Sequence, residues 1–139
     1  MAVDTTPAIG TEVPPFVRNT NFHNWNRYAA VNDEFVPIHM DDEAGRDAGF
    51  PSAIGMGNLL WAYLHNMLRE WIGEAGRIVA VSCSFRSPNL RGMTVEARGT
   101  VTGVRVEDGT TFVDLDVSVV DRDAPDTVLA PGRATVVIG

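Results

Sequence analysis

The chain has 139 residues, and its 11 basic and 18 acidic side chains give a formal net charge of −7. This balance disfavours nucleic acid as a partner, because proteins that bind phosphate backbones carry a basic face. Every basic residue is Arg, and the lack of Lys excludes Schiff-base, pyridoxal-phosphate and Walker-type chemistry in this chain, since each depends on a lysine.

Length and composition predict one domain over residues 1–139, because a hydrophobic content of 45% is enough for one core of ordinary size. The single cysteine, Cys83, excludes an internal disulfide and a zinc site built from several thiolates, and it favours a cytoplasmic setting. Residues 1–10 lack the pattern of a targeting signal and are expected to be flexible. No stretch is apolar over the length that a membrane span requires.

The first half of the chain has the apolar spacing of helices. The longest helix carries pairs of apolar residues at four-residue intervals, which predicts a broad buried face. These residues are Leu59, Leu60, Tyr63, Leu64, Met67, Leu68 and Trp71. The elements expected here are a short strand (Phe16–Thr20), a helix capped by Asn21, a loop (Val31–His39), a short helix from Asp41 to Gly49 and the long helix from about Asn58 to Gly73.

The second half alternates as strands do, and turn residues at Glu107–Gly109 and Asp123–Asp126 predict hairpins. The expected strands are Arg77–Arg86, Met93–Val106, Thr110–Arg122 and Thr127–Ile138. One long buried helix followed by a meander predicts an α+β fold in which a curved antiparallel sheet wraps around a central helix. Such a sheet covers one side of the helix, so a second, homologous subunit is also expected.

One segment has the residues for acid–base chemistry. Asp33 and Glu34 precede a Phe-Val-Pro-Ile corner, and His39 follows it. A carboxylate and an imidazole that converge on a water are the minimum apparatus for adding or removing water. From the residues alone, the alternative is that both acids are solvated charges at a helix end and that His39 caps the next helix.

Four stretches, in order, carry a resemblance to a known family. They are Tyr28-Ala29, the run from Asp33 to Asp41, Ile54-Gly55-Met56-Gly57-Asn58, and Phe85-Arg86-Ser87-Pro88 with Gly92. From about Gly10 onward the chain resembles the MaoC-like hot-dog dehydratases, which include (R)-specific enoyl-CoA hydratases and hydroxyacyl-thioester dehydratases.

The resemblance implies a hot-dog fold and a role for each site residue. It places Glu34 at the catalytic acid, His39 at the histidine that shares its water, and the Gly57 amide at the oxyanion site. Asp33 is kept as a second candidate for the acid. A glycine at a helix N-terminus also suits the oxyanion role on physical grounds, because it offers an unpaired N–H and the positive end of the helix dipole. The alternative for Gly57 is a tight turn into the helix.

The implied function is a hydratase or dehydratase that interconverts 2-enoyl-CoA and (R)-3-hydroxyacyl-CoA and needs no metal or organic cofactor. The implied partner is an acyl thioester of coenzyme A or of acyl carrier protein. Val36 and Met56 replace the Asn and His of the family pattern, which motivates an alternative: a subunit with reduced chemistry that forms the binding half of a heteromer. A hot-dog thioesterase is the third hypothesis for the function. The protein is expected to assemble as a homodimer or as a heteromer with another hot-dog subunit.

The remaining ionisable residues point to surface or packing roles. His23 and His65 show no metal-ligand spacing, and Cys83 fits a small core residue. Three arginines near the strand ends are candidates for contact with the phosphates of a ligand: Arg77, Arg86 and Arg91.

Overall fold

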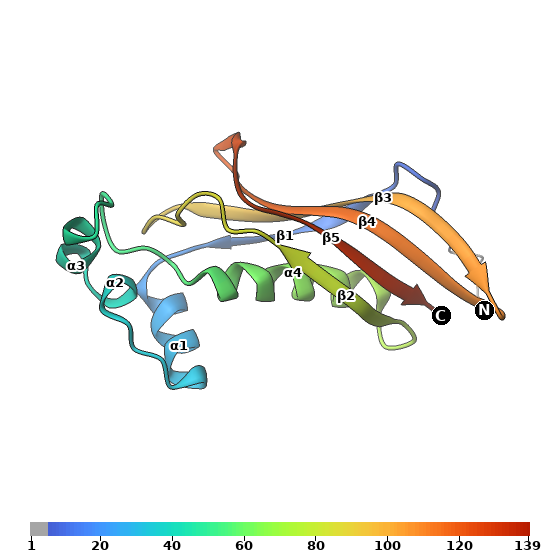
Figure 1. Cartoon of the computed structure of the whole chain (residues 1–139), viewed down its shortest axis with the longest axis horizontal. Helices are drawn as coiled ribbons and strands as arrows, with labels where there is room; N and C mark the ends of the chain where they lie inside the picture. Colours follow the sequence, from blue (N-terminus) through green and yellow to red (C-terminus); the bar gives the residue numbers. More distant parts are fainter. Residues whose placement is uncertain (1–5) are drawn as a thin grey trace.

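A computed structural model describes residues 6–139 and shows a five-stranded antiparallel sheet in the order β1-β3-β4-β5-β2. The long helix α4 lies along one face of the sheet (Figure 1). The elements are β1 (Glu12–Asn19), α1 (Phe22–Asn32), α2 (Pro37–Met40), α3 (Asp42–Asp47), α4 (Gly57–Ile72), β2 (Arg77–Cys83), β3 (Thr94–Glu107), β4 (Thr110–Asp121) and β5 (Ala124–Ile138). The predicted α+β fold, a curved antiparallel sheet around one central helix, is confirmed.

The apolar face of α4 forms the centre of the core, as its spacing predicts. Leu64 and Leu68 are fully buried, and Met67 is 1% exposed. The sheet meets this face with small and branched side chains that are also buried: Val95, Ala97 and Val101 from β3, Val113, Leu115 and Val119 from β4, and Leu129, Ala134 and Val136 from β5. Burial of each leucine side chain contributes about 1.5–3 kcal/mol, so this contact fixes α4 on the sheet.

The strand β2 forms one edge of the sheet and leaves apolar side chains uncovered. Val79 is 45% exposed on this strand, and Trp61 of the adjacent α4 is 41% exposed. The indole N–H of Trp61 donates to the Val81 carbonyl at 3.1 Å, which ties the helix to the edge strand. An edge with exposed apolar groups is a surface on which another strand can pair.

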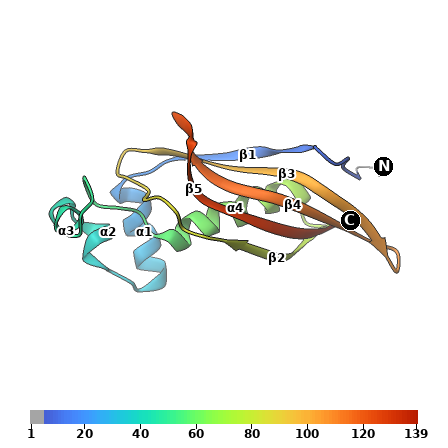
Figure 2. The same ribbon diagram turned by 45° about the horizontal axis from the view of Figure 1, so that its top comes forward.

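The three short helices gather at the N-terminal end of α4 (Figures 1 and 2). Asn21 caps α1 through a capping box with Asn24, as its position predicts. The prediction of a loop over residues 31–39 is wrong at both ends, because α1 continues to Asn32 and Pro37 begins α2. Proline is tolerated at the first position of a helix, where its missing N–H would have no partner.

Two strand boundaries also differ from the sequence prediction. The turn between β4 and β5 lies at Arg122–Asp123 rather than over residues 123–126, and Pro125 lies inside β5 where the pairing with β4 is irregular. β1 begins at Glu12 and accommodates Pro14 and Pro15 at a break in its register with β3. Local irregularities therefore absorb prolines that the sequence reading placed outside strands.

Residues 1–10 are predicted to be flexible, and residues 1–5 of this segment lie outside the described residues. Within the described part, the Gly10 N–H donates to the Val101 carbonyl at 2.8 Å. No helix within residues 6–139 is both long enough and apolar enough to cross a membrane.

We predict that Leu64→Ala lowers the free energy of unfolding by about 2–5 kcal/mol, because it leaves a cavity where α4 meets the sheet. Val106→Ala is the matched control, since Val106 is 67% exposed; its cost should stay within about 0.5 kcal/mol. Urea unfolding of both variants measures the difference. Equal costs would contradict the assigned core.

Candidate functional site

The segment that leads into α4 is held from two sides. Ile54 forms a bridge with Leu90, and the Gly55 N–H donates to the Asn89 carbonyl at 2.7 Å. Gly55 has no space for a side chain, because a Cβ there would lie 2.8 Å from both Asn89 Oδ1 and Trp25 Nε1. This close packing fixes the backbone just before the helix begins.

His39 is positioned by the same segment. The Ile54 N–H donates to the Ile38 carbonyl at 2.9 Å, and the Nδ1 atom of His39 lies 2.7 Å from the Ile54 carbonyl oxygen. A carbonyl oxygen only accepts, so Nδ1 carries the hydrogen and donates. In the neutral imidazole, Nε2 then keeps its lone pair and is a hydrogen-bond acceptor or a base.

A cavity of about 320 Å³ brings His39 and Gly57 together. Its walls are largely apolar. Among the described residues that line it, Arg86 is the only Arg, Lys, Asp or Glu. The lining is His39, Phe50, Ile54, Gly55, Gly57, Leu60, Phe85, Arg86, Ser87, Pro88 and Asn89. We call this space the His39–Gly57 cavity; it combines an apolar lining with a few polar groups, as sites for small molecules do.

Gly57 is the first residue of the 16-residue helix α4. Its N-cap residue, Met56, provides no side-chain hydrogen bond to the first turn. The Leu59 N–H donates to the Met56 carbonyl at 3.1 Å, whereas the Gly57 N–H lies at the positive end of the helix dipole, where a ligand can accept it. A Cβ at Gly57 would lie 2.8 Å from the Phe85 ring. The glycine therefore lets an aromatic wall approach the helix start closely.

Asp33 and Glu34 lie outside the His39–Gly57 cavity, and both are exposed. Asp33 caps α1 in the left-handed conformation, with a φ of 55°, and donates its backbone N–H to the Ala29 carbonyl. The Glu34 N–H donates to the same carbonyl at 3.0 Å. The structure thus brings together two of the predicted site residues, His39 and Gly57, and leaves both carboxylates at the end of α1; their catalytic role stays a prediction.

Two of the positions that depart from the family pattern, Met56 and Val36, have different surroundings. Met56 is 7% exposed and belongs to the hydrophobic core. Val36 is 44% exposed and precedes α2. Met56 therefore supplies packing, whereas Val36 places an exposed apolar side chain three residues before His39.

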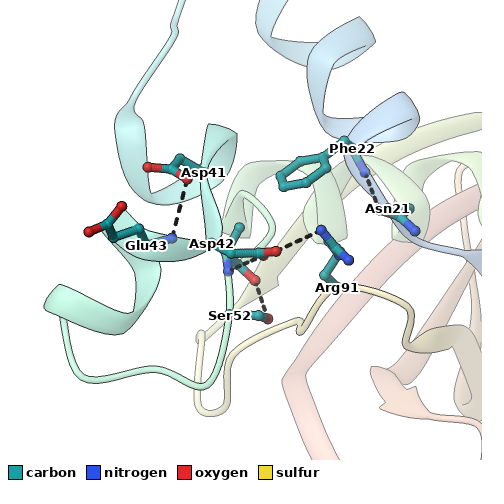
Figure 3. A network of polar contacts seen from close by, with 8 residues as sticks. Asn21, Phe22, Asp41, Asp42, Glu43, Ser52 and Arg91 are labelled. Carbon is teal, nitrogen blue, oxygen red and sulfur yellow. Dashed lines mark hydrogen bonds and ion pairs between the residues drawn. The ribbon is translucent and has the colours of Figure 1, made fainter.

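The acids that follow His39 are structural (Figure 3). Asp41 caps α3 by accepting the Glu43 N–H at 3.2 Å. Asp42 accepts the Ala53 N–H at 3.0 Å and pairs with Arg91 at 2.7 Å. The bonds of Asp42 join α3 to the segment before α4 and to Arg91.

The three arginines suggested for ligand phosphates separate in the structure. Arg86 lines the His39–Gly57 cavity. Arg91 is paired with Asp42, and its guanidinium lies 5.0 Å from the centre of the Phe22 ring. Arg77 lines a different hollow, beside Trp61 and β2. Only Arg86 is placed to meet a charged group at the mouth of this cavity.

Sequence reasoning missed Asn89 and Thr20, two buried polar residues behind the site. They are 2% and 0% exposed. The Asn89 amide donates to Thr20 Oγ1 at 2.8 Å, and Thr20 Oγ1 donates to the Met93 carbonyl at 2.8 Å. In the sequence, neither residue differs from an ordinary residue at a turn. The two come close together only in the fold, where β1 pairs with β3.

The other candidate residues have structural environments. His23 is exposed, and the His65 ring donates through Nδ1 to the Trp61 carbonyl at 2.8 Å. Cys83 is partly buried against the core, and this burial raises the pKa of its thiol above the ordinary value of 9.0. Within residues 6–139, no group of three or more His, Cys, Asp or Glu side chains is arranged to hold a metal ion.

A curved antiparallel sheet wrapped around one long central helix is the architecture of the hot-dog class. The model of the MaoC-like domain matches residues 5–122. The chain therefore belongs to the MaoC-like dehydratase family.

Solved structures share the fold at low sequence identity. The (R)-hydratase from A. caviae involved in PHA biosynthesis superposes with a TM-score of 0.85 at 20% identity, covering 97% of this chain and 99% of that chain. The ChsH1–ChsH2 complex from Mycobacterium tuberculosis gives 0.81 at 15% identity, with 95% and 98% covered. The HadBC 3R-hydroxyacyl-ACP dehydratase complex from the same organism gives 0.71 at 17% identity, with 95% and 98% covered. No curated protein matches the sequence.

We predict that Asp42→Ala destabilises the protein by about 1–2 kcal/mol, because it removes an acceptor for the Ala53 N–H together with a partly exposed ion pair. Asp47→Ala is the matched control, since Asp47 is exposed at the end of α3, where a negative charge opposes the helix dipole. Thermal unfolding should show a lower midpoint for Asp42→Ala only. Equal midpoints for the two variants would refute the bracing role.

Proposed function

We propose that the protein is a hydratase or dehydratase of acyl thioesters that interconverts 2-enoyl-CoA and (R)-3-hydroxyacyl-CoA. The observation that supports this most is the pairing of His39 and Gly57 in one apolar cavity. The Nδ1–Ile54 bond leaves Nε2 of His39 as an acceptor for a water, and the α4 N-terminus supplies a donor for the thioester carbonyl.

In the hydration direction, a base removes a proton from water while the water oxygen bonds to C3 of the enoyl thioester. The electron pair of the C2–C3 double bond moves toward the thioester carbonyl, whose oxygen gains negative charge. The Gly57 N–H stabilises that charge, because it is already oriented at the positive helix end. A proton then adds to C2, and dehydration follows the same steps in reverse. The chemistry requires no metal or organic cofactor.

The proposed acid–base partner of His39 is Glu34, with Asp33 as the second candidate. Both acids belong to the exposed stretch between α1 and α2, so a change in the conformation of this stretch does not disturb the core. We infer that binding of the thioester draws one carboxylate toward the water held by His39. Coenzyme A is the proposed carrier, since a net charge of −7 disfavours a strongly acidic carrier protein.

Specific observations favour a second candidate, the binding half of a heteromeric hydratase. Both acids lie outside the cavity, and an apolar residue, Val36, stands where the family pattern has Asn. The exposed Val79 and Trp61 at the β2 edge offer a surface for another hot-dog subunit. Two of the similar structures are themselves complexes, ChsH1–ChsH2 and HadBC.

Crotonyl-CoA separates the candidates. We expect the chain to remove the enone absorbance and to form the (R)-3-hydroxy product. Saturable binding without turnover would favour the heteromer subunit, and release of free thiol would favour a thioesterase. If the chain neither binds nor turns over crotonyl-CoA, the proposal is overturned.

His39→Asn tests the base directly, because an Asn amide retains a donor for the Ile54 carbonyl but lacks an atom equivalent to Nε2. We predict that it lowers kcat by about 100-fold or more while the unfolding midpoint changes little. His23→Asn is the matched control, since His23 is exposed outside the cavity. Unchanged turnover in His39→Asn would remove His39 from the mechanism.

Gly57→Ala keeps the backbone N–H and tests whether the thioester occupies the space beside the helix start. Its Cβ must displace the Phe85 ring, which is 53% exposed and free to move, so stability should change by less than about 1 kcal/mol. The displaced ring occupies the cavity, and a misplacement of about 1 Å lowers kcat/KM by about 100-fold. Phe85→Ala in the same chain should restore part of the loss. An unchanged kcat/KM in Gly57→Ala would contradict the placement of the thioester beside the helix start.

A further inference from the structure

A second cavity, of about 310 Å³, lies between α1, α4 and β1. We call it the α1–α4 cavity. It shares no lining residue with the His39–Gly57 cavity, so the proposed hydration chemistry does not account for it. Its lining combines two arginines with neutral donors and an apolar wall.

Arg18 and Arg27 give this cavity a positive charge. No Asp or Glu is among the described residues that line it. Within residues 6–139 neither arginine forms an ion pair, whereas Arg91, Arg98 and Arg105 are paired with carboxylates. In a chain with a net charge of −7, two arginines without a lining carboxylate make this cavity locally positive. Among the described residues, the hollow beside β2 is also lined by two arginines, Arg69 and Arg77, and by no acid.

The Arg18 side chain is exposed, and two contacts orient it. Its Nη1 atom donates to the Val17 carbonyl at 2.8 Å. Its guanidinium also lies 3.9 Å from the centre of the Phe16 ring. A guanidinium fixed by these contacts loses less conformational entropy when it binds an anion, and its remaining N–H groups are available as a fork.

The neutral polar groups at the cavity are also donors. Asn24 Oδ1 accepts the Asn21 N–H at 2.8 Å, so the donor end of the Asn24 side chain is its amide NH₂. Tyr63 is 6% exposed, and burial raises its pKa above the ordinary value of 10.0, against smaller opposing effects of Arg18 and of a hydrogen bond with the Asn24 side chain. The Tyr63 hydroxyl therefore keeps its proton at neutral pH.

One side of the cavity is apolar. Leu59 is 8% exposed at its wall, and Val31 is 79% exposed at its rim. A fully hydrated inorganic ion gains nothing from such a wall, whereas an aliphatic chain gains free energy by covering it.

We propose that the α1–α4 cavity binds a small organic carboxylate with a short aliphatic body. The carboxylate contacts the guanidiniums of Arg18 and Arg27, whose planar forks match its two oxygens. The aliphatic part covers Val31 and Leu59. This site is independent of the proposed hydratase activity, and its occupancy is measurable whether or not the chain turns over a thioester.

The test is a titration of the isotopically labelled full chain, followed by the backbone amide signals. Butyrate is the probe, butan-1-ol is its neutral counterpart, and inorganic phosphate tests charge without an apolar body. We expect saturable shifts with butyrate in residues 24–31 and 59–66, and much smaller shifts with the other two. Butyrate shifts confined to residues 39 and 54–57 would assign the anion to the His39–Gly57 cavity and overturn the proposal.

Substitutions of the two arginines separate this site from general electrostatic attraction. Arg27→Gln and Arg18→Gln should each weaken butyrate binding by about fivefold or more, and the double variant should lose saturable binding. Arg46→Gln is the matched control, because Arg46 is an exposed arginine in α3 outside the cavity. All three positions are exposed, and the amide spectrum of each variant reports whether the fold is retained.

Three results would overturn the proposal. Equal affinity in the double variant and the native chain would remove the arginines from the site. Equal binding of phosphate and butyrate would remove the apolar body from the ligand. Equal weakening by Arg46→Gln would show attraction to net charge alone.

Discussion

Burial of one face of α4 against the sheet is the constraint on which the rest of the structure depends. Leu64, Met67 and Leu68 lie under strands β3, β4 and β5, so the helix cannot shift along the sheet without exposing a row of core side chains. The position of the helix start is thereby fixed. Gly57 presents its N–H at a defined place because the apolar face of α4 is locked to the sheet behind it.

The site then depends on a few backbone bonds around Ile54. Its N–H and its carbonyl bind Ile38 and His39, while its neighbour Gly55 binds Asn89. These bonds place the imidazole beside the helix start and select the hydrogen position on its ring. Asp42 and Arg91 brace the other end of the same segment (Figure 3). The positioning apparatus is rigid, whereas both candidate carboxylates lie on an exposed stretch outside it.

The fold could be predicted from the sequence where one strong periodic signal governs an element. The stripe of α4 and the alternation of β4 are such signals, and Asn21 caps its helix as expected. The site could be predicted only in part. His39 and Gly57 share a cavity because of contacts between segments, and the Asn89–Thr20 bond joins residues 69 positions apart. The conformation of residues 33–36 depends on the left-handed cap at Asp33, which a residue pattern does not reveal.

A crystal structure of the protein with bound 3-hydroxybutyryl-CoA tests the central claim most directly. We expect that the thioester carbonyl accepts the Gly57 N–H, that the 3-hydroxyl meets Nε2 of His39, and that Nδ1 remains bonded to the Ile54 carbonyl. We also expect a carboxylate from Glu34 or Asp33 within hydrogen-bond distance of that hydroxyl. A thioester bound away from Gly57, or a His39 ring that has left Ile54 to contact the ligand through Nδ1, would refute the proposed roles of Gly57 and His39.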